Sequence, residues 1–151
     1  MSPFMICITT FGGCLLGSLV PLVNTELLVV SMAALAPAWL LAPVVGLAAT
    51  GQIAGKIVLY LTGRGTIGLG KAREHPRVKP LLGRLQSHRR AGGMILFASA
   101  SAGLPPLYAM SVACGMVDFG LRRFVGIGLV GRLLRFGLLV QVPHLFAQVA
   151  Q

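Results

Sequence analysis

The sequence predicts an all-α, polytopic membrane protein built from two inverted repeats, each a re-entrant hairpin followed by one membrane span. Three stretches carry no formal charge: Met1–Thr25, Leu27–Gly55 and Ala91–Val117. Each is longer than the roughly 20 residues that cross about 30 Å of hydrocarbon. Prolines break the first and the third stretch, and a basic segment separates the second from the third. These three observations carry the prediction.

The composition argues against an ordinary soluble domain. Of the 151 residues, 56% are hydrophobic and only 11% are charged. A soluble domain of this length needs more charged surface to stay dispersed. The chain begins without a basic segment ahead of its first apolar run, so we do not expect a cleavable signal peptide.

The first repeat is expected over about residues 4–62. Its apolar segment Phe4–Leu35 is broken around Pro21, and Pro37 closes it before a span over about Ala38–Thr62. At about 1.5 Å per residue, the two pieces of the broken segment barely suffice for two full crossings. A hairpin that enters and leaves by one face is therefore favoured. The alternative is six short helices packed around proline kinks.

The positive net charge of +10 has one main source, the loop predicted over residues 63–92. Eight of the 13 basic residues lie between Arg64 and Arg90, where Glu74 is the only acid. A basic block between apolar segments is typical of a cytoplasmic loop. Its leucines, from Leu81 to Leu85, predict a helix either on the inner leaflet or on the protein's own cytoplasmic face.

This placement of the charges decides the expected partners. Lys and Arg near the surface attract anionic lipids by about 1 kcal/mol each, so we expect anionic membrane lipids and no nucleic acid. The expected lipid contacts are Arg77, Lys79, Arg84, Arg89 and Arg90.

The second repeat is expected over about residues 93–149. Its apolar segment Met94–Val117 is broken at Pro105-Pro106, and a span follows over about Phe124–Val149. With the basic loop in the cytoplasm, the first hairpin dips in from outside and the second from inside. Asp118 then returns to the cytoplasm, where we expect it to pair with Arg122 four residues on. Inverted repeats with broken segments are a recurrent transporter architecture. The whole chain, 1–151, forms a single membrane domain in this prediction.

Glu26 is the first candidate functional residue. A carboxylate in so apolar a stretch needs a partner, a proton or a watery cavity, and a helix broken beside it needs protein or water to satisfy its backbone. Arg132 and Arg135 share one helical face and either turn inward, toward a phosphate or Glu26, or snorkel to the interface. Lys56 is expected to snorkel. The predicted substrate or ion path comprises Pro21, Asn24, Glu26, Pro105, Pro106, Tyr108, Arg132 and Arg135.

Catalysis, metals and cofactors are not expected. Three acids and three histidines assemble into no catalytic triad, carboxylate pair or metal-ligand set, so we do not expect an enzyme. The three cysteines lack metal-type spacing. Gly63–Gly68 spells G-x-G-x-x-G but follows an apolar span instead of a strand, so no dinucleotide site is expected. The spacing of Gly51 and Gly55 predicts close helix packing.

Four segments resemble one known family. The stretch Gly51–Arg64, followed by Gly68, resembles the G-x3-G-x4-Y-x2-G-R-x3-G signature of the DedA family, also described as VTT-domain or SNARE-associated Golgi proteins. The segment Pro21–Glu26 is similar to the acidic re-entrant motif of that family. Gly103–Pro106 and Ala113–Met116 are similar to its second hairpin.

The resemblance implies a multi-pass protein of the bacterial plasma membrane, with opposed re-entrant hairpins and a cytoplasmic basic loop. Members are associated with lipid movement between leaflets, namely polyprenyl phosphate recycling or phospholipid scrambling. Other members are linked to proton-dependent transport and envelope homeostasis. Glu26 would be the acid of the first hairpin, and Pro105-Pro106 the turn of the second.

Departures from the family pattern limit this transfer. Ala102 and Tyr108 stand where many bacterial members carry arginines, and Lys56 replaces an acid or amide. We expect Arg132 or Arg135 to supply the missing positive charge. The chain also lacks the flanking spans of larger members, which leaves room for a homodimer. Three functions stay open: lipid translocation or scrambling, proton-coupled transport of small ions or solutes, and a structural role that recruits partners through the basic loop.

Overall fold

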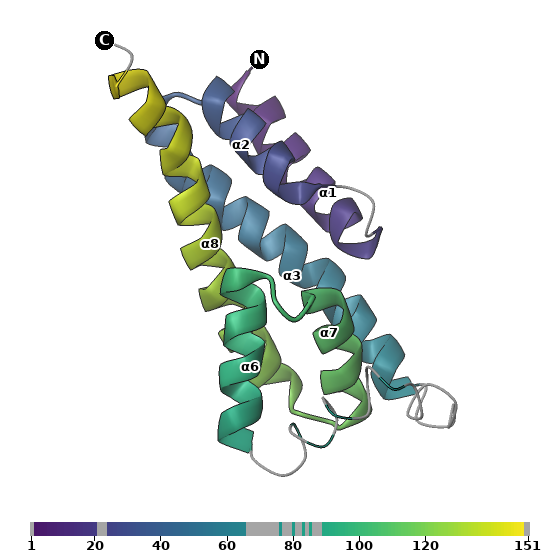
Figure 1. Ribbon diagram of the computed structural model, residues 1–151. Helices are drawn as coiled ribbons and strands as arrows, with labels where there is room; N and C mark the ends of the chain where they lie inside the picture. Colours follow the sequence, from purple (N-terminus) through teal and green to yellow (C-terminus); the bar gives the residue numbers. More distant parts are fainter. Residues whose placement is uncertain are drawn as a thin grey trace. The chain divides into compact units, whose positions relative to one another are not determined.

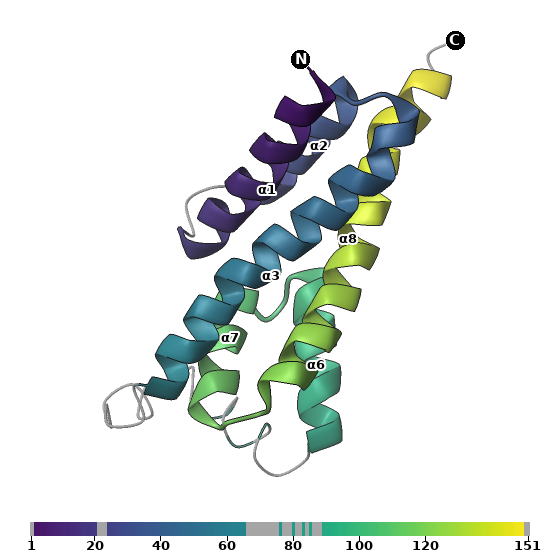
Figure 2. The ribbon, with the colours of Figure 1, turned by 180° about the vertical axis from the view of Figure 1, so that it is seen from behind.

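The computed structural model describes residues 2–20, 24–65, 76, 80, 83, 85 and 89–149. Its regular elements are α1 (Pro3–Leu19), α2 (Thr25–Leu35), the 3-10 turn η1 (Ala38–Leu40), α3 (Leu41–Gly65), α6 (Arg89–Ala102), α7 (Leu107–Met116) and α8 (Leu121–Val149) (Figures 1 and 2). The described part of the chain is helical and contains no strand, which confirms the predicted all-α class. The leucines of the predicted loop helix, apart from Leu85, lie outside the described residues, as does Pro21.

Among the described residues, two helices are long and apolar enough to cross a membrane. One combines η1 and α3 over Ala38–Gly65, 28 residues, and the other is the Leu121–Gln141 part of α8, 21 residues. They overlap the two predicted spans, and the second candidate begins and ends earlier than the predicted Phe124–Val149. The hairpin helices are shorter: α2 has 11 residues and α7 has 10. At 1.5 Å per residue they rise only about 17 and 15 Å, roughly half of a bilayer core.

The chain divides into two compact units. Unit 1 comprises residues 1–55 and 132–151, and unit 2 comprises residues 56–131. Helices α3 and α8 therefore each contribute one part to unit 1 and the other part to unit 2. Each unit also contains one pair of consecutive short helices, α1 and α2 in the first, α6 and α7 in the second.

In unit 1, α1 and α2 pack side by side and are joined through a segment that ends at Asn24 (Figure 1). The Asn24 Oδ1 atom accepts hydrogen bonds from the N–H groups of Glu26 and Leu27, at 3.2 and 3.3 Å. Asparagine is a preferred helix N-cap because it satisfies these otherwise unpaired donors. Nearby, Ile6, Ala36, Leu40 and Val44 form a small buried cluster.

In unit 2, the α6–α7 connection turns at the two predicted prolines. The Leu104–Pro105 peptide bond is cis, and Gly103 has a φ of 83°. The Ser99 hydroxyl donates a hydrogen bond to the Pro105 carbonyl, and Pro106 directly precedes α7. Unit 2 also contains a hydrophobic core of buried residues, which comprises Tyr60, Leu85, Leu96, Ala100, Leu107, Met110, Ala113, Cys114, Met116, Phe119 and Phe124.

Tyr60 of α3 forms hydrogen bonds with two residues of the turn between α7 and α8. Its hydroxyl donates to Asp118 Oδ1 at 3.4 Å and accepts from the Gly120 N–H at 3.2 Å. Its ring lies 5.1 Å from the Phe124 ring. Asp118 also forms an ion pair with Arg64 at 3.4 Å, and not the predicted one with Arg122. The physical reason is that Asp118 precedes α8 with a φ of 49°, so the helical four-residue spacing does not apply.

Glycines allow the close packing that their spacing predicted. A Cβ atom at Gly51 would lie 2.6 Å from the Phe11 carbonyl oxygen, and one at Gly55 would lie 2.9 Å from that of Leu15. Both carbonyls belong to α1, so these glycines let α3 approach the backbone of α1 directly. This confirms the packing interpretation of the pair.

Gly115 gives a test of this packing in unit 2. A Cβ atom there would overlap the Tyr60 carbonyl and lie 2.9 Å from the Arg64 nitrogen, both backbone atoms of α3. We expect Gly115→Ala to lower the free energy of unfolding by about 1–3 kcal/mol, because backbone cannot move aside as a flexible side chain can. Gly46→Ala is the matched control, since a Cβ atom there meets nothing within 4 Å. Denaturant unfolding in detergent measures the free energy of unfolding of both variants. If Gly115→Ala is as stable as Gly46→Ala, the close packing at Gly115 is contradicted.

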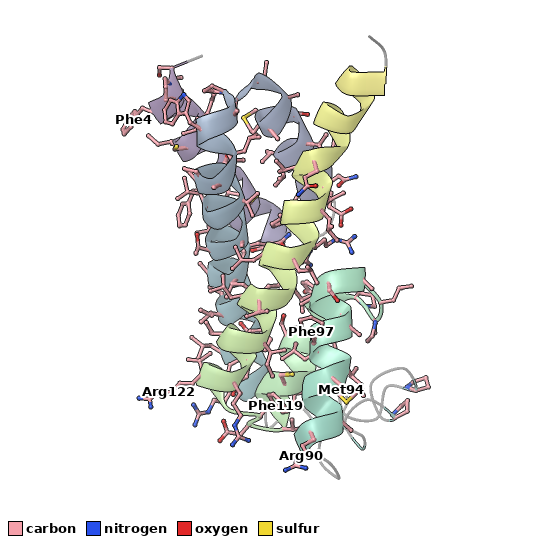
Figure 3. All side chains as sticks on the ribbon, turned by 90° about the vertical axis from the view of Figure 1, so that its left-hand side faces the viewer. Phe4, Arg90, Met94, Phe97, Phe119 and Arg122 are labelled. Atoms are coloured by element: carbon pink, nitrogen blue, oxygen red, sulfur yellow. The ribbon has the colours of Figure 1, made fainter. Side chains whose placement is uncertain are left out.

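Besides the apolar cores, the described residues include large apolar side chains that are exposed and polar side chains that are buried. Large apolar residues are exposed on every long helix, among them Phe4, Leu27, Trp39, Met94 and Leu138 (Figure 3 shows Phe4 and Met94). Polar residues are buried instead: Thr10, Ser18, Thr25, Gln52, Lys56, Ser99, Ser111 and Arg132. Several buried hydroxyls donate to carbonyls of the preceding turn, as in Thr10 to Ile6 at 2.7 Å. This arrangement suits an apolar solvent.

Candidate functional site

The candidate site lies in unit 1, where α2 meets the second half of α8. Glu26 is the second residue of α2, directly after the Asn24 cap. An acid in the first turn of a helix is stabilised by the positive end of the helix dipole. The break in the first apolar segment therefore has two consequences. A helix begins at Thr25, within an otherwise apolar part of the chain, and its first turn carries the Glu26 carboxylate.

Arg135 of α8 binds this carboxylate. Its Nε donates to Glu26 Oε1 at 2.9 Å, and its Nη2 donates to the same oxygen. The side chains keep 39% exposure for Glu26 and 20% for Arg135, so the pair is partly covered and open on one side. The sequence alone left open which of the two arginines meets Glu26. The structure brings Arg135 to it.

Arg132 lies one helical turn before Arg135 and does not snorkel. The residue is only 7% exposed. Its Nε has no hydrogen-bond partner among the described residues. Its guanidinium carbon lies 5.8 Å from the ring centroid of Phe136, a contact that partly offsets the loss of water. The charges of Glu26 and Arg135 are close enough to act on it.

The cluster therefore holds two guanidinium groups for one carboxylate, an excess of one positive charge. A buried charge is costly unless it is paired, and a buried donor without an acceptor adds a further cost of about 1–3 kcal/mol. The cation–π contact with Phe136 supplies no acceptor for Arg132 Nε. Guanidinium groups pair best with anions that carry oxygen acceptors, such as a carboxylate or a phosphate.

Gln52 is a member of the site that sequence reasoning missed. Its Nε2 donates to the hydroxyl of Thr25, the residue before Glu26, at 2.7 Å. Its Oε1 is buried and has no hydrogen-bond partner within the described part of the chain, and exchanging the two amide atoms would instead leave an N–H group unpaired there. The available signal was that Gln52 is the only amide side chain in the charge-free stretch Leu27–Gly55.

The other predicted path residues belong to unit 2. Pro105 and Pro106 form the α6–α7 turn, and Tyr108 stands in the first turn of α7, 44% exposed. The Tyr108 ring has the Lys56 Nζ at 5.5 Å from its centroid. Lys56 is only 6% exposed, so the prediction that it snorkels is wrong. The Tyr108 ring gives the Lys56 ammonium group a cation–π partner within the protein, in place of lipid head groups.

The predicted lipid-contacting residues are described only in part. Arg90 is exposed in the first turn of α6, and Arg89 is the first residue of that helix. Arg77, Lys79 and Arg84 lie outside the described residues. Their role in lipid contact stays a prediction.

Comparisons with known proteins assign this arrangement to no family: no family model matches the chain, and neither curated proteins nor solved structures gave a match. Within the described residues, no three His, Cys, Asp or Glu side chains are grouped as metal ligands would be. The fold and site thus define an all-helical chain with two helices able to cross a membrane and an arginine-rich charge cluster in unit 1.

Proposed function

We propose that the chain is an integral membrane protein of the DedA type that moves lipids with an anionic head group between the two leaflets. The observation that carries the proposal is Arg132: a buried guanidinium with an unpaired Nε, in a cluster with one more positive than negative charge. In an apolar chain such a site is expensive to maintain, and charged residues at membrane depth mark substrate paths.

The lengths of the short helices support re-entrant hairpins. With rises of about 17 and 15 Å, α2 and α7 reach only to about the middle of a bilayer. Each pair of short helices is followed by a helix of spanning length, α3 or α8, which is the order expected of two hairpin-and-span repeats. In this proposal α1–α2 and α6–α7 open the bilayer for a head group, while its acyl chains stay in lipid.

The three charged side chains have separate roles in this mechanism. Arg132 supplies the charge that compensates the phosphate and the N–H that it accepts. Arg135, which binds Glu26 and is partly exposed, exchanges Glu26 for the phosphate as the head group arrives. Glu26 then recovers Arg135 and helps the phosphate to leave, because transport requires binding that is weak enough to reverse.

A reconstituted transfer assay tests the proposal. Proteoliposomes are loaded with fluorescent phosphatidylglycerol, phosphatidylcholine or polyprenyl phosphate, and a membrane-impermeant quencher reports how much label reaches the outer leaflet. We expect faster transfer of the anionic lipids than in protein-free vesicles. Transfer at the protein-free rate for every lipid would contradict the proposal.

The same vesicles separate the two other candidate functions. A pH-sensitive dye inside them reports solute-driven proton flux, and flux without lipid movement would favour the proton-coupled transporter with Glu26 as proton carrier. Cellular activity that survives loss of Glu26 but not loss of the Arg64–Arg90 charges would favour recruitment of partners through the basic loop. Neither outcome is what the arginine excess leads us to expect.

A further inference from the structure

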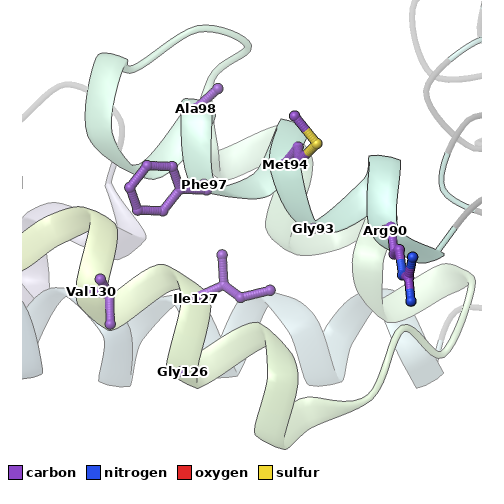
Figure 4. A pocket seen from close by; sticks show the side chains of 8 residues that line it. All are labelled: Arg90, Gly93, Met94, Phe97, Ala98, Gly126, Ile127 and Val130. Carbon is purple, nitrogen blue, oxygen red and sulfur yellow. The ribbon is translucent and has the colours of Figure 1, made fainter.

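Unit 2 contains an apolar groove that the proposed mechanism does not use. It lies between α6 and the first part of α8, with a volume of about 780 Å³ (Figure 4). Such a volume is within the range of about 300–1,000 Å³ found for small-molecule sites. Arg90, Gly93, Met94, Phe97 and Ala98 of α6 line it, with Gly126, Ile127 and Val130 of α8.

Glycine accounts for the space. A Cβ atom at Gly126 would meet nothing within 4 Å, so the open volume begins at the α8 backbone itself. Further along α8, a Cβ atom placed on Gly131 would lie 2.6 Å from the Ala100 Cβ atom. The two helices are therefore in close contact there. The helices are also in contact at Gly93, where a Cβ atom would lie 3.3 Å from the Ile127 Cδ1 atom, so the groove runs along the surface of the α6–α8 contact.

One end of the groove carries the only charged residue in its lining, Arg90. In Figure 4 it stands at one end of the row, beyond Gly93, while Met94 and Phe97 continue the apolar wall. Figure 3 shows Arg90 at the same end of unit 2 as Arg122, another exposed arginine. Because Arg90 is in the first turn of α6, an anion beside it also meets the positive end of the helix dipole.

We propose that this groove holds one acyl chain of an anionic phospholipid, with the head-group phosphate at Arg90. The apolar side chains of α6 and α8 along this open groove suit a hydrocarbon chain, and the Arg90 guanidinium at one end attracts a negative head group. Met94, 74% exposed, and Val130, 58% exposed, would otherwise face the surroundings with no fixed partner. The inference rests on the proposed membrane location but not on lipid translocation.

Fluorescence quenching by brominated lipids tests it. The chain has one tryptophan, Trp39 in unit 1, so Phe97→Trp in a Trp39→Phe background places the sole fluorophore in the groove. We expect brominated phosphatidylglycerol to bind beside it about five-fold more tightly than brominated phosphatidylcholine, as one arginine near the membrane surface contributes. The wild-type protein, whose exposed Trp39 reports bulk lipid, should show no preference.

Two further substitutions in the reporter background separate the head group from the chain. Arg90→Gln should reduce the preference to about one. Gly126→Leu should lower quenching by both lipids because it fills the groove, whereas Gly137→Leu, at a second unobstructed α8 glycine outside the groove, should not.

Three results would overturn the inference: no preference in the reporter, a preference that survives Arg90→Gln, or quenching unaffected by Gly126→Leu. Quenching that falls as the protein-to-lipid ratio rises would overturn it too, since it would show a second copy of the chain in the groove. A protein that binds lipid here yet transfers none would retain this inference and lose the proposed function.

Discussion

Arg132→Met is expected to reduce transfer of an anionic lipid at least ten-fold while leaving the protein as stable as the wild type, or more stable. The methionine side chain has a similar length and fills the position beside Phe136. Replacing a buried, incompletely paired charge with an apolar side chain is commonly neutral or stabilising by about 1–4 kcal/mol. A residue that costs stability and is needed for activity is typical of a functional site.

Transfer in proteoliposomes and thermal unfolding in detergent measure the two halves of this prediction. Arg123→Met is the matched control, because Arg123 is an exposed arginine at the beginning of the same helix. It should alter neither quantity by much. If Arg132→Met instead unfolds the protein, Arg132 is a structural residue and its assignment to the lipid path is wrong.

Glu26→Gln is expected to have the second largest effect, and on both quantities. It leaves the Arg135 guanidinium without its carboxylate and raises the excess charge of the cluster from one to two. Charge-assisted hydrogen bonds contribute about 1.5–3 kcal/mol, and the partial exposure of both side chains places the loss near the lower end. Transfer should fall at least ten-fold, because no carboxylate is left to recover Arg135 and the two guanidinium groups retain the phosphate.

The exchanged pair, Glu26→Arg with Arg135→Glu, tests whether the two side chains act together. It keeps the net charge of the cluster, so the double variant should be more stable than the sum of its two single variants predicts. A sum that is simply additive would show that the Glu26–Arg135 contact contributes nothing to the fold.

The helices could be predicted from the sequence because the signals are local. Long, mostly apolar segments indicated the two spans, and Asn24 and Pro106 precede the first residues of α2 and α7. The presence of an inward arginine could also be predicted, since Arg132 and Arg135 share a face and a lone acid needs a partner. Which of them reaches Glu26 depends on how α8 rotates against α2, and this follows from packing over the whole helix.

Other contacts could not be predicted from the sequence, because they too depend on how distant segments pack together. Lys56 has a neighbour, Tyr108, that is 52 positions away, and no spacing rule connects them. Asp118 bonds to Tyr60 and Arg64 because the α7–α8 turn returns to α3. Such contacts join segments distant in sequence, whereas helical periodicity reports only neighbours three or four positions apart.

The central claim is that the Glu26, Arg132 and Arg135 cluster passes an anionic head group through the membrane. The most direct test compares wild type, Arg132→Met and Glu26→Gln in one proteoliposome assay, with fluorescent phosphatidylglycerol and phosphatidylcholine in parallel. The account predicts that the wild type transfers phosphatidylglycerol faster than phosphatidylcholine, and that each variant loses most of the phosphatidylglycerol rate. Equal transfer of both lipids, unchanged in both variants, would contradict it.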